Sequence, residues 1–184
     1  GAEVREMNLS QLIYETWSSP PNINSDVIAL NQKIALSQIE NLFNKFNFES
    51  MKNEIFSIEE SFDFIDEGIQ INGRFDLVTK KNDKVEIIDF KSGSHNKEQH
   101  KKYDNQLKFY SYCFEKKHNI KPYKLSVIYL NDSSKIFSDT NFVNSEIKSN
   151  FLNISKKIDN QKFEATPGNH CKDCAFRNNC EFKA

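Results

Sequence analysis

The sequence lacks two features of proteins that enter membranes. It contains no apolar run of the roughly 20 residues that a membrane-spanning helix needs. Its first ten residues, GAEVREMNLS, are too polar for a secretory signal peptide. We therefore expect a cytoplasmic protein with no membrane partner. The chain also begins at Gly1 without a methionine, from which we expect a piece of a larger protein.

The chain also has a net charge close to zero and few arginines. The formal charge is -1, from 25 basic and 26 acidic residues. The arginines are Arg5, Arg74 and Arg177. Such a balanced chain excludes generic binding of polyanions by its whole surface. One local basic run is either a solvated surface or a set of phosphate contacts: His95, Lys97, His100, Lys101 and Lys102.

Cysteine is absent before Cys113, and the other three cysteines lie in the last fourteen residues. This distribution excludes a disulfide framework and favours a metal or cluster site in a reducing compartment. Cys171, Cys174 and Cys180 have the spacing C-x2-C-x5-C, which lets three thiolates reach one centre. A fourth ligand could come from Cys113, from His170 or from a cysteine elsewhere in a larger protein. The alternatives are zinc on a Cys3His set, three bare thiols, and Cys113 as a small buried side chain.

The remaining pattern predicts an α/β fold. Helical spacing of apolar residues predicts helices at 7–17, 28–46, about 100–117 and 144–159. Branched and aromatic residues predict strands at 55–64, 69–79, 85–91, 123–130 and 134–138. The predicted buried stripe of the second helix is Ile28, Ala35, Leu36, Ile39, Leu42, Phe43 and Phe46. This order of elements indicates a mixed β-sheet flanked by helices, within the size of one domain.

The most informative stretch spans residues 69–93, IQINGRFDLVTKKNDKVEIIDFKSG. Two strand-like runs flank Asn82 and Asp83, which are good turn residues. If these two form the loop, paired residues have numbers that sum to 165, and Asp76 lies directly opposite Asp89. Directly opposed residues have Cβ atoms about 4.5–5.5 Å apart. A longer loop would shift this register.

The predicted pair of carboxylates indicates a metal site. Two carboxylates this close repel each other unless a cation lies between them. Lys91 lies two residues after Asp89 and shares its strand face. Two acids that hold Mg²⁺ or Mn²⁺, with a lysine that orients the attacking water, suit phosphodiester hydrolysis. The alternative is a surface salt-bridge cluster; the paired Asp76 and the flanking Gly73 and Gly93 favour the functional interpretation.

The runs GRFD, IIDFKSG and QLKFY resemble the PD-(D/E)XK nuclease superfamily. They are most similar to its RecB-like branch, which includes nuclease domains of AddAB helicase–nucleases, of UvrD-type helicase fusions and of CRISPR-associated adaptation nucleases. The resemblance covers about residues 59–114 and the cysteine tail. It implies a restriction-endonuclease-like core and DNA as the substrate.

By this resemblance, three groups of the hairpin would hold the metal: the carboxylates of Asp76 and Asp89 and the backbone carbonyl of Phe90. Lys91 would be the catalytic lysine. The family also places a glutamate upstream of the first aspartate, before an aromatic strand. The run SIEESF offers Glu59, three residues before Phe62, with Glu60 as the alternative.

Other parts of the chain match the family less evenly. Gln106 and Tyr110 match its Q-L-x-x-Y helix and share a helix face, so we expect them to point back at the site; ordinary packing is the alternative. Tyr14 stands where the family carries a metal-ligating histidine, which implies weaker metal binding, a substitute ligand such as Glu15, or a lost activity. The family's cysteine triple joins an upstream cysteine to hold a [4Fe-4S] cluster, and this chain has no N-terminal cysteine.

These observations together predict a single domain over residues 1–184, with N-terminal helices at 1–50, a nuclease core at 55–160 and a cysteine-rich tail at 166–184. The expected activity is Mg²⁺- or Mn²⁺-dependent cleavage of DNA, single-stranded at the cut site and exonucleolytic. The expected context is repair or recombination, with a helicase in the same chain or as a partner. The alternatives are a catalytically silent DNA-binding module and a cysteine-centred structural domain, which leaves the hairpin unexplained.

Overall fold

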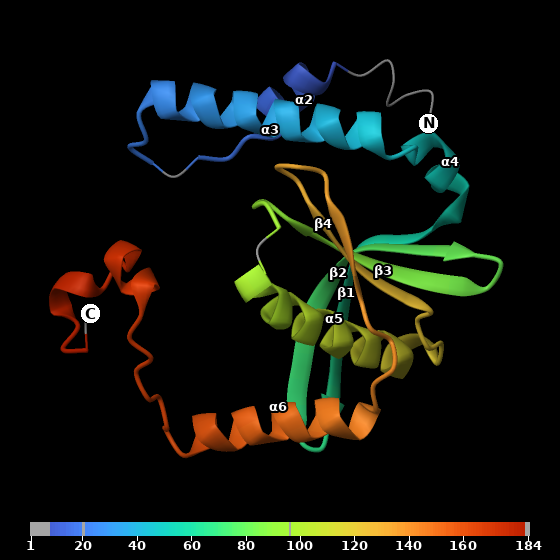
Figure 1. Cartoon of the computed structure of the whole chain (residues 1–184), viewed down its shortest axis with the longest axis vertical. Coiled ribbons are helices and arrows are strands. Elements are labelled where there is room, and N and C mark those ends of the chain that lie inside the picture. Colours follow the sequence, from blue (N-terminus) through green and yellow to red (C-terminus); the bar gives the residue numbers. More distant parts are fainter. Residues whose placement is uncertain (1–7, 20, 96, 183–184) are drawn as a thin grey trace. The chain divides into compact units, whose positions relative to one another are not determined.

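Figure 1 shows the computed structural model of the chain, which describes residues 8–19, 21–95 and 97–182. The helices are α2 (Leu9–Thr16), α3 (Ser25–Lys45), α4 (Phe48–Met51), η1 (Lys52–Glu54), α5 (Lys97–His118), α6 (Asn144–Asp159), η2 (Asn169–Asp173) and η3 (Arg177–Asn179). The strands are β1 (Ile55–Asp66), β2 (Ile69–Lys81), β3 (Lys84–Lys91), β4 (Lys124–Tyr129) and β5 (Lys135–Ser138).

The chain divides into two compact units, Gly1–Ile147 and Lys148–Ala184. The first unit contains the whole sheet and helices α2 to α5. The second contains most of α6 and the short helices of the tail. The predicted extent of one domain over residues 1–184 stays a prediction. No helix in the described ranges is both long and apolar enough to cross a bilayer.

The five strands form one mixed sheet in the order β1-β2-β3-β4-β5. Strands β1, β2 and β3 are joined by hairpins and pair antiparallel. Strand β4 pairs parallel with β3, because α5 returns the chain to the same end of the sheet before β4 begins. Strand β5 then pairs antiparallel with β4. This confirms the predicted α/β fold, a mixed sheet flanked by helices.

Helices α3 and α5 cover opposite faces of this sheet (Figure 1). On the α3 face, Leu42 packs with Leu77, Ile88 and Ile128, and Phe46 borders this cluster. The predicted burial of Phe43 is wrong, since 44% of its surface is exposed. The reason is geometric: Phe46, which directly follows α3, lies about one turn beyond Leu42, whereas Phe43 is rotated by about 100° from Leu42.

On the α5 face, aromatic rings fill the space between helix and sheet. Phe75 of β2 lies edge-on to Tyr110 and Phe114 of α5, with ring centroids 5.6 Å apart in each pair. Phe62 of β1 stacks on Phe75 at 4.7 Å and lies over Gly73. A Cβ atom at Gly73 would be 2.4 Å from the Cζ atom of Phe62, which is 3% exposed. This strand position therefore accepts no side chain without movement of the ring.

We expect Gly73→Ala to lower the free energy of unfolding by about 1–3 kcal/mol, the usual cost of overpacking a core. Gly93→Ala is the matched control, because a Cβ atom there would meet no atom within 4 Å. Urea unfolding followed by circular dichroism measures both. Equal stabilities of the two variants would contradict the packing of Phe62 on Gly73.

Candidate active site

The β2–β3 hairpin has the predicted two-residue turn. Asn82 and Asp83 have φ angles of 47° and 62°, the left-handed values that a type I′ turn requires at both positions. The pairing runs from Lys81 with Lys84 to Leu77 with Ile88. The predicted register is therefore confirmed along this ladder.

The same register leads to Asp76 and Asp89, where the pairing of β2 and β3 ends. The Asp76 Oδ2 atom accepts a hydrogen bond of 2.8 Å from the backbone N–H of Phe90. A carboxylate of β2 thus takes the place of a backbone carbonyl in holding β3. Asp89 is 2% exposed and lies on a strand with neighbours on both sides, since β4 pairs with it through Val127.

Strand β2 loses its regular alternation beside Asp76. Leu77 faces α3, so strict alternation would also turn Phe75 toward α3. Phe75 instead contacts α5, and Asp76, whose charge acts on Tyr110 of α5, lies on this same face. On β1, Glu59 has a φ of 52°, and the ladder passes from Ile58 to Glu60 without it. Such local interruptions of a strand pair redirect side chains and are common beside active sites.

Lys91 completes a charged cluster on the α5 face. Its Nζ atom lies 2.6 Å from Asp89 Oδ2 and 5.0 Å from the ring centroid of Tyr103. Burial raises the pKa of Asp89, and the charge of Asp76 raises it further, whereas the hydrogen bond and charge of Lys91 lower it. Asp89 is therefore a desolvated carboxylate that gains from a nearby cation.

Helix α5 adds two side chains to this face. Gln106 Nε2 donates a 3.1 Å hydrogen bond to the hydroxyl of Tyr110. Burial raises the pKa of Tyr110, and the charges of Asp89 and Asp76 raise it further. The hydroxyl of Tyr110 thus stays protonated near neutral pH and senses both carboxylates, as expected for a helix that faces the hairpin.

The side chain of Glu59 is engaged with Arg74. Its carboxylate forms a 2.6 Å ion pair with Arg74, and about half of its side chain is exposed. In the part of the chain that the structure describes, no three His, Cys, Asp or Glu side chains are gathered to hold a metal ion. The hairpin therefore brings together two carboxylates, Asp76 and Asp89, and the role of Glu59 as a ligand stays a prediction.

The donor set fits a hard divalent cation. Carboxylates and backbone carbonyls are the oxygen ligands that Mg²⁺ and Mn²⁺ favour. Asp89 is buried with a raised pKa, and Asp76 is close enough to repel it. A cation between them would relieve both the desolvation of Asp89 and this repulsion. The Phe90 backbone, already fixed by Asp76, could supply a further oxygen.

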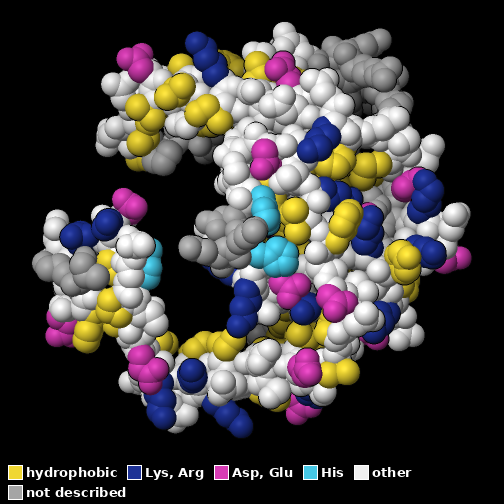
Figure 2. All heavy atoms as spheres, viewed as in Figure 1, with side chains coloured by type: hydrophobic (Ala, Val, Ile, Leu, Met, Phe, Trp, Pro, Cys, Tyr) yellow, Lys and Arg dark blue, Asp and Glu magenta, His cyan; other side chains and the backbone are white. Residues whose placement is uncertain are grey.

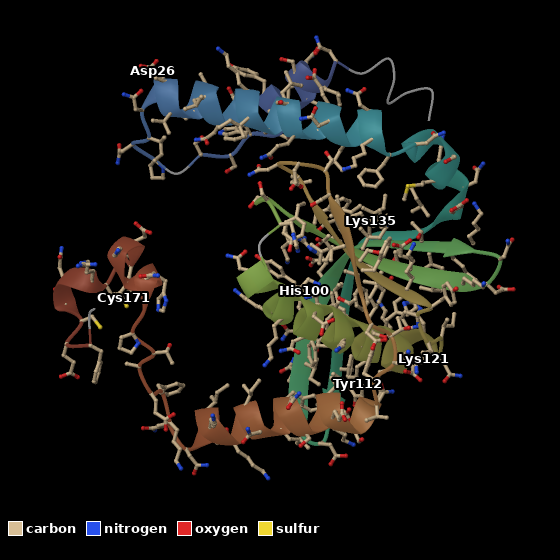
Figure 3. The ribbon with its side chains drawn as sticks, in the orientation of Figure 1. Asp26, His100, Tyr112, Lys121, Lys135 and Cys171 are labelled. Atoms are coloured by element: carbon tan, nitrogen blue, oxygen red, sulfur yellow. The ribbon has the colours of Figure 1, made fainter. Side chains whose placement is uncertain are left out.

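The cysteines do not form a comparable group. Cys113 on α5 is fully buried, and burial raises its pKa to about 12, which suits a packed thiol rather than a metal ligand. Cys171 lies in the tail (Figure 3), where its Sγ atom accepts a 3.4 Å hydrogen bond from Gly168 N–H. Cys174 is exposed and Cys180 half-buried, and the structure does not bring the three thiols of the tail to one centre.

Two further positions bear on the site. Tyr14, where the resembled family carries a histidine, lies on α2 with 75% of its surface exposed, and the neighbouring Glu15 accepts a hydrogen bond from Gln11. The sequence analysis missed Tyr103 and Tyr129, although both border Lys91. Parallel pairing of the third predicted strand with the fourth could have placed Tyr129 beside Lys91.

We expect Asp89→Asn to stabilise the fold at pH 7, by about 0.5–2 kcal/mol, because it removes a buried charge beside a second carboxylate. Since the folded-state pKa of Asp89 is raised, its charge costs stability above that pKa and costs none below the unfolded value near 3.8. The gain should therefore disappear as the pH falls toward 4. Thermal unfolding of both proteins at pH 7 and pH 4 measures this, and a loss of stability at pH 7 would contradict it.

Comparison with known proteins identifies the family. The family model of the PD-(D/E)XK nuclease superfamily matches residues 2–181. A search of curated proteins found no match. Among solved structures, the crystal structure of SSO0001 has a TM-score of 0.51 and 16% sequence identity over 98% of each chain, a likeness of fold. With a family match over nearly its whole length, the chain belongs to the PD-(D/E)XK nuclease superfamily.

Proposed function

We propose that the chain is a metal-dependent nuclease that hydrolyses phosphodiester bonds of DNA. The observation that supports this most is the cluster at the end of the β2–β3 hairpin. Asp76 is held against the Phe90 backbone, and Asp89 is buried beside Asp76 and ion-paired with Lys91. A salt bridge at the surface would not need a buried carboxylate next to a second one.

Asp76, Asp89 and the Phe90 carbonyl would hold Mg²⁺ or Mn²⁺. When bound, such an ion polarises the phosphoryl oxygen and lowers the pKa of the attacking water. Lys91 orients the water and offsets the negative charge that develops on the phosphoryl oxygens. The water oxygen bonds to phosphorus, one ester P–O bond breaks, and the leaving oxygen takes up a proton. The Tyr110 hydroxyl accepts a hydrogen bond from Gln106 and would donate its own proton in a hydrogen bond to the substrate phosphate on the α5 side.

We propose a RecB-like context for this activity, as a domain or partner of a DNA helicase in repair or recombination. The support is the resemblance of the GRFD, IIDFKSG and QLKFY runs to that branch. The same resemblance favours exonucleolytic cutting of a strand that is single at the cut site, in the cytoplasm. For the tail, the spacing C-x2-C-x5-C is the sole support for a [4Fe-4S] cluster or a zinc ion at Cys171, Cys174 and Cys180, and binding of either would have to gather these thiols, which lie apart in the described part of the chain.

A second candidate is a catalytically silent module that keeps the nuclease fold and binds DNA. The observation that favours it is Tyr14, an exposed tyrosine where the resembled family has a metal-ligating histidine. The intact cluster of Asp76, Asp89 and Lys91 favours the enzyme. Cleavage separates the two candidates, because only the enzyme turns over its substrate.

We expect the wild-type protein to cut labelled DNA with Mn²⁺ or Mg²⁺ and to lose about 10²–10³-fold in rate in Lys91→Ala, the usual cost of removing one group that stabilises transition-state charge. The comparison uses end-labelled single- and double-stranded oligonucleotides, with EDTA as the metal-free reference.

Lys135→Ala is the matched control for this experiment. Lys135 is also a half-buried lysine, ion-paired at 2.7 Å with Glu86, and it lies on β5 (Figure 3). It should cut like the wild type. Equal cutting by all three proteins would indicate a contaminant, and no cutting by the wild type would favour the silent module.

A further inference from the structure

Four rings form a cluster beside Lys91, which we call the ring cluster: His95, His100, Tyr103 and Tyr129. The ring centroids of His95 and His100 are 6.2 Å apart, those of His95 and Tyr129 5.6 Å, and those of Tyr103 and Tyr129 6.2 Å. The Lys91 Nζ atom lies 5.0 Å from the Tyr103 centroid. An unbroken series of ring contacts therefore leads from the two histidines to Lys91.

The segment that carries His95 is fixed to the rest of the fold. After β3, the carbonyls of Lys91 and Gly93 accept hydrogen bonds of 2.8 and 3.4 Å from the N–H groups of Leu130 and Asn131. Asp132 has a lowered pKa, chiefly through hydrogen bonds from Ser134 and also through one from the backbone of His95. The segment after β3 is thus joined to the turn after β4 at several points.

Exposure within the ring cluster is graded. Tyr129 is 1% exposed and forms the base, Tyr103 and His100 are half-buried, and His95 is exposed. Figure 3 shows His100 near the start of α5. The imidazoles therefore present ring surface to an incoming group, while the phenols pack beneath them and reach Lys91.

Positive charge alone would not make the surface at the ring cluster a binding site for nucleic acid. On the face drawn in Figure 2, lysine and arginine side chains are interspersed with aspartate and glutamate. Lys101 and Lys102 next to His100 are exposed and can reach phosphates, but the chain as a whole carries a formal charge of -1. Aromatic rings add affinity for single-stranded nucleic acid by stacking on its bases, whatever their sequence.

We propose that the ring cluster is a nucleobase subsite for the base next to the phosphate that Lys91 faces. One of the two imidazoles stacks on this base, and the other, whose plane is at 87° to the first, contacts its edge. This rests on the proposed nuclease function and specifies its substrate. Bases of a duplex are already stacked on their neighbours, so only an unpaired base can enter. The subsite therefore selects a strand that is single at the cut.

The test compares two fluorescent oligonucleotides of equal length in EDTA, where no metal supports cutting. One is oligo-dT, and the other carries abasic sites throughout, with the same phosphates and no bases. Fluorescence anisotropy gives the Kd of each for the wild type, for His95→Ala/His100→Ala and for His95→Phe/His100→Phe. Tyr123→Ala, which removes an exposed ring that contacts Lys84, is the control.

We expect the double alanine variant to bind oligo-dT about 10-fold more weakly, within the roughly 5- to 150-fold worth of one stacked base. Its affinity for the abasic strand should not change, the double phenylalanine variant should restore binding to oligo-dT, and Tyr123→Ala should match the wild type. An equal loss on both strands, or equal binding of both by the wild type, would overturn the proposal in favour of phosphate contacts.

Failure of this subsite and failure of the proposed nuclease function give different results. Base-dependent binding that relies on His95 and His100, without any cutting in Mn²⁺, would support the nucleobase subsite and contradict the proposed nuclease function. Cutting in Mn²⁺ together with binding that does not depend on bases would support the nuclease function and contradict the subsite.

Discussion

The hydrogen bond from the Phe90 N–H to the Asp76 carboxylate is the contact on which the site depends. At this point β3 leaves the ladder with β2 and continues beside β4 alone. A side-chain oxygen replaces the backbone acceptor, so the carboxylate is fixed relative to the β3 backbone. Asp89 on one side of Phe90 and Lys91 on the other are positioned by the same bond. The interruption of β2 beside Asp76 lets Phe75 join the aromatic core under α5 without moving this carboxylate.

The charged form of Asp89 lowers the stability of the fold. Burial disfavours the charge of Asp89, Asp76 disfavours it further, and Lys91 offsets only part of the effect. Residues whose charged forms are disfavoured by the fold are concentrated at functional sites, because binding or catalysis uses the stored free energy. The surrounding sheet tolerates the cost since Ile87, Ile88 and Val78 beside it are fully buried and packed.

Much of this site could be predicted because hairpin geometry is local. Asn82 and Asp83 determine a two-residue turn, and the register of both strands follows from it by counting. The position of Glu59 could not be predicted, since it depends on a left-handed φ within β1 and on the ion pair with Arg74. The ring cluster was missed for a similar reason: Tyr129 meets Lys91 only through parallel pairing of strands 33 or more residues apart, which no local pattern records.

Titration of Mn²⁺ into the metal-free protein tests whether Asp76 and Asp89 form one divalent-cation site, without reference to cutting. Calorimetry or the electron paramagnetic resonance signal of free Mn²⁺ gives the affinity. We expect binding by the wild type, a loss of affinity of at least about 10-fold in Asp76→Asn and in Asp89→Asn, and no change in Glu86→Gln, whose carboxylate is paired with Lys135. Binding that is equal in all four proteins, or absent from the wild type, would contradict such a site.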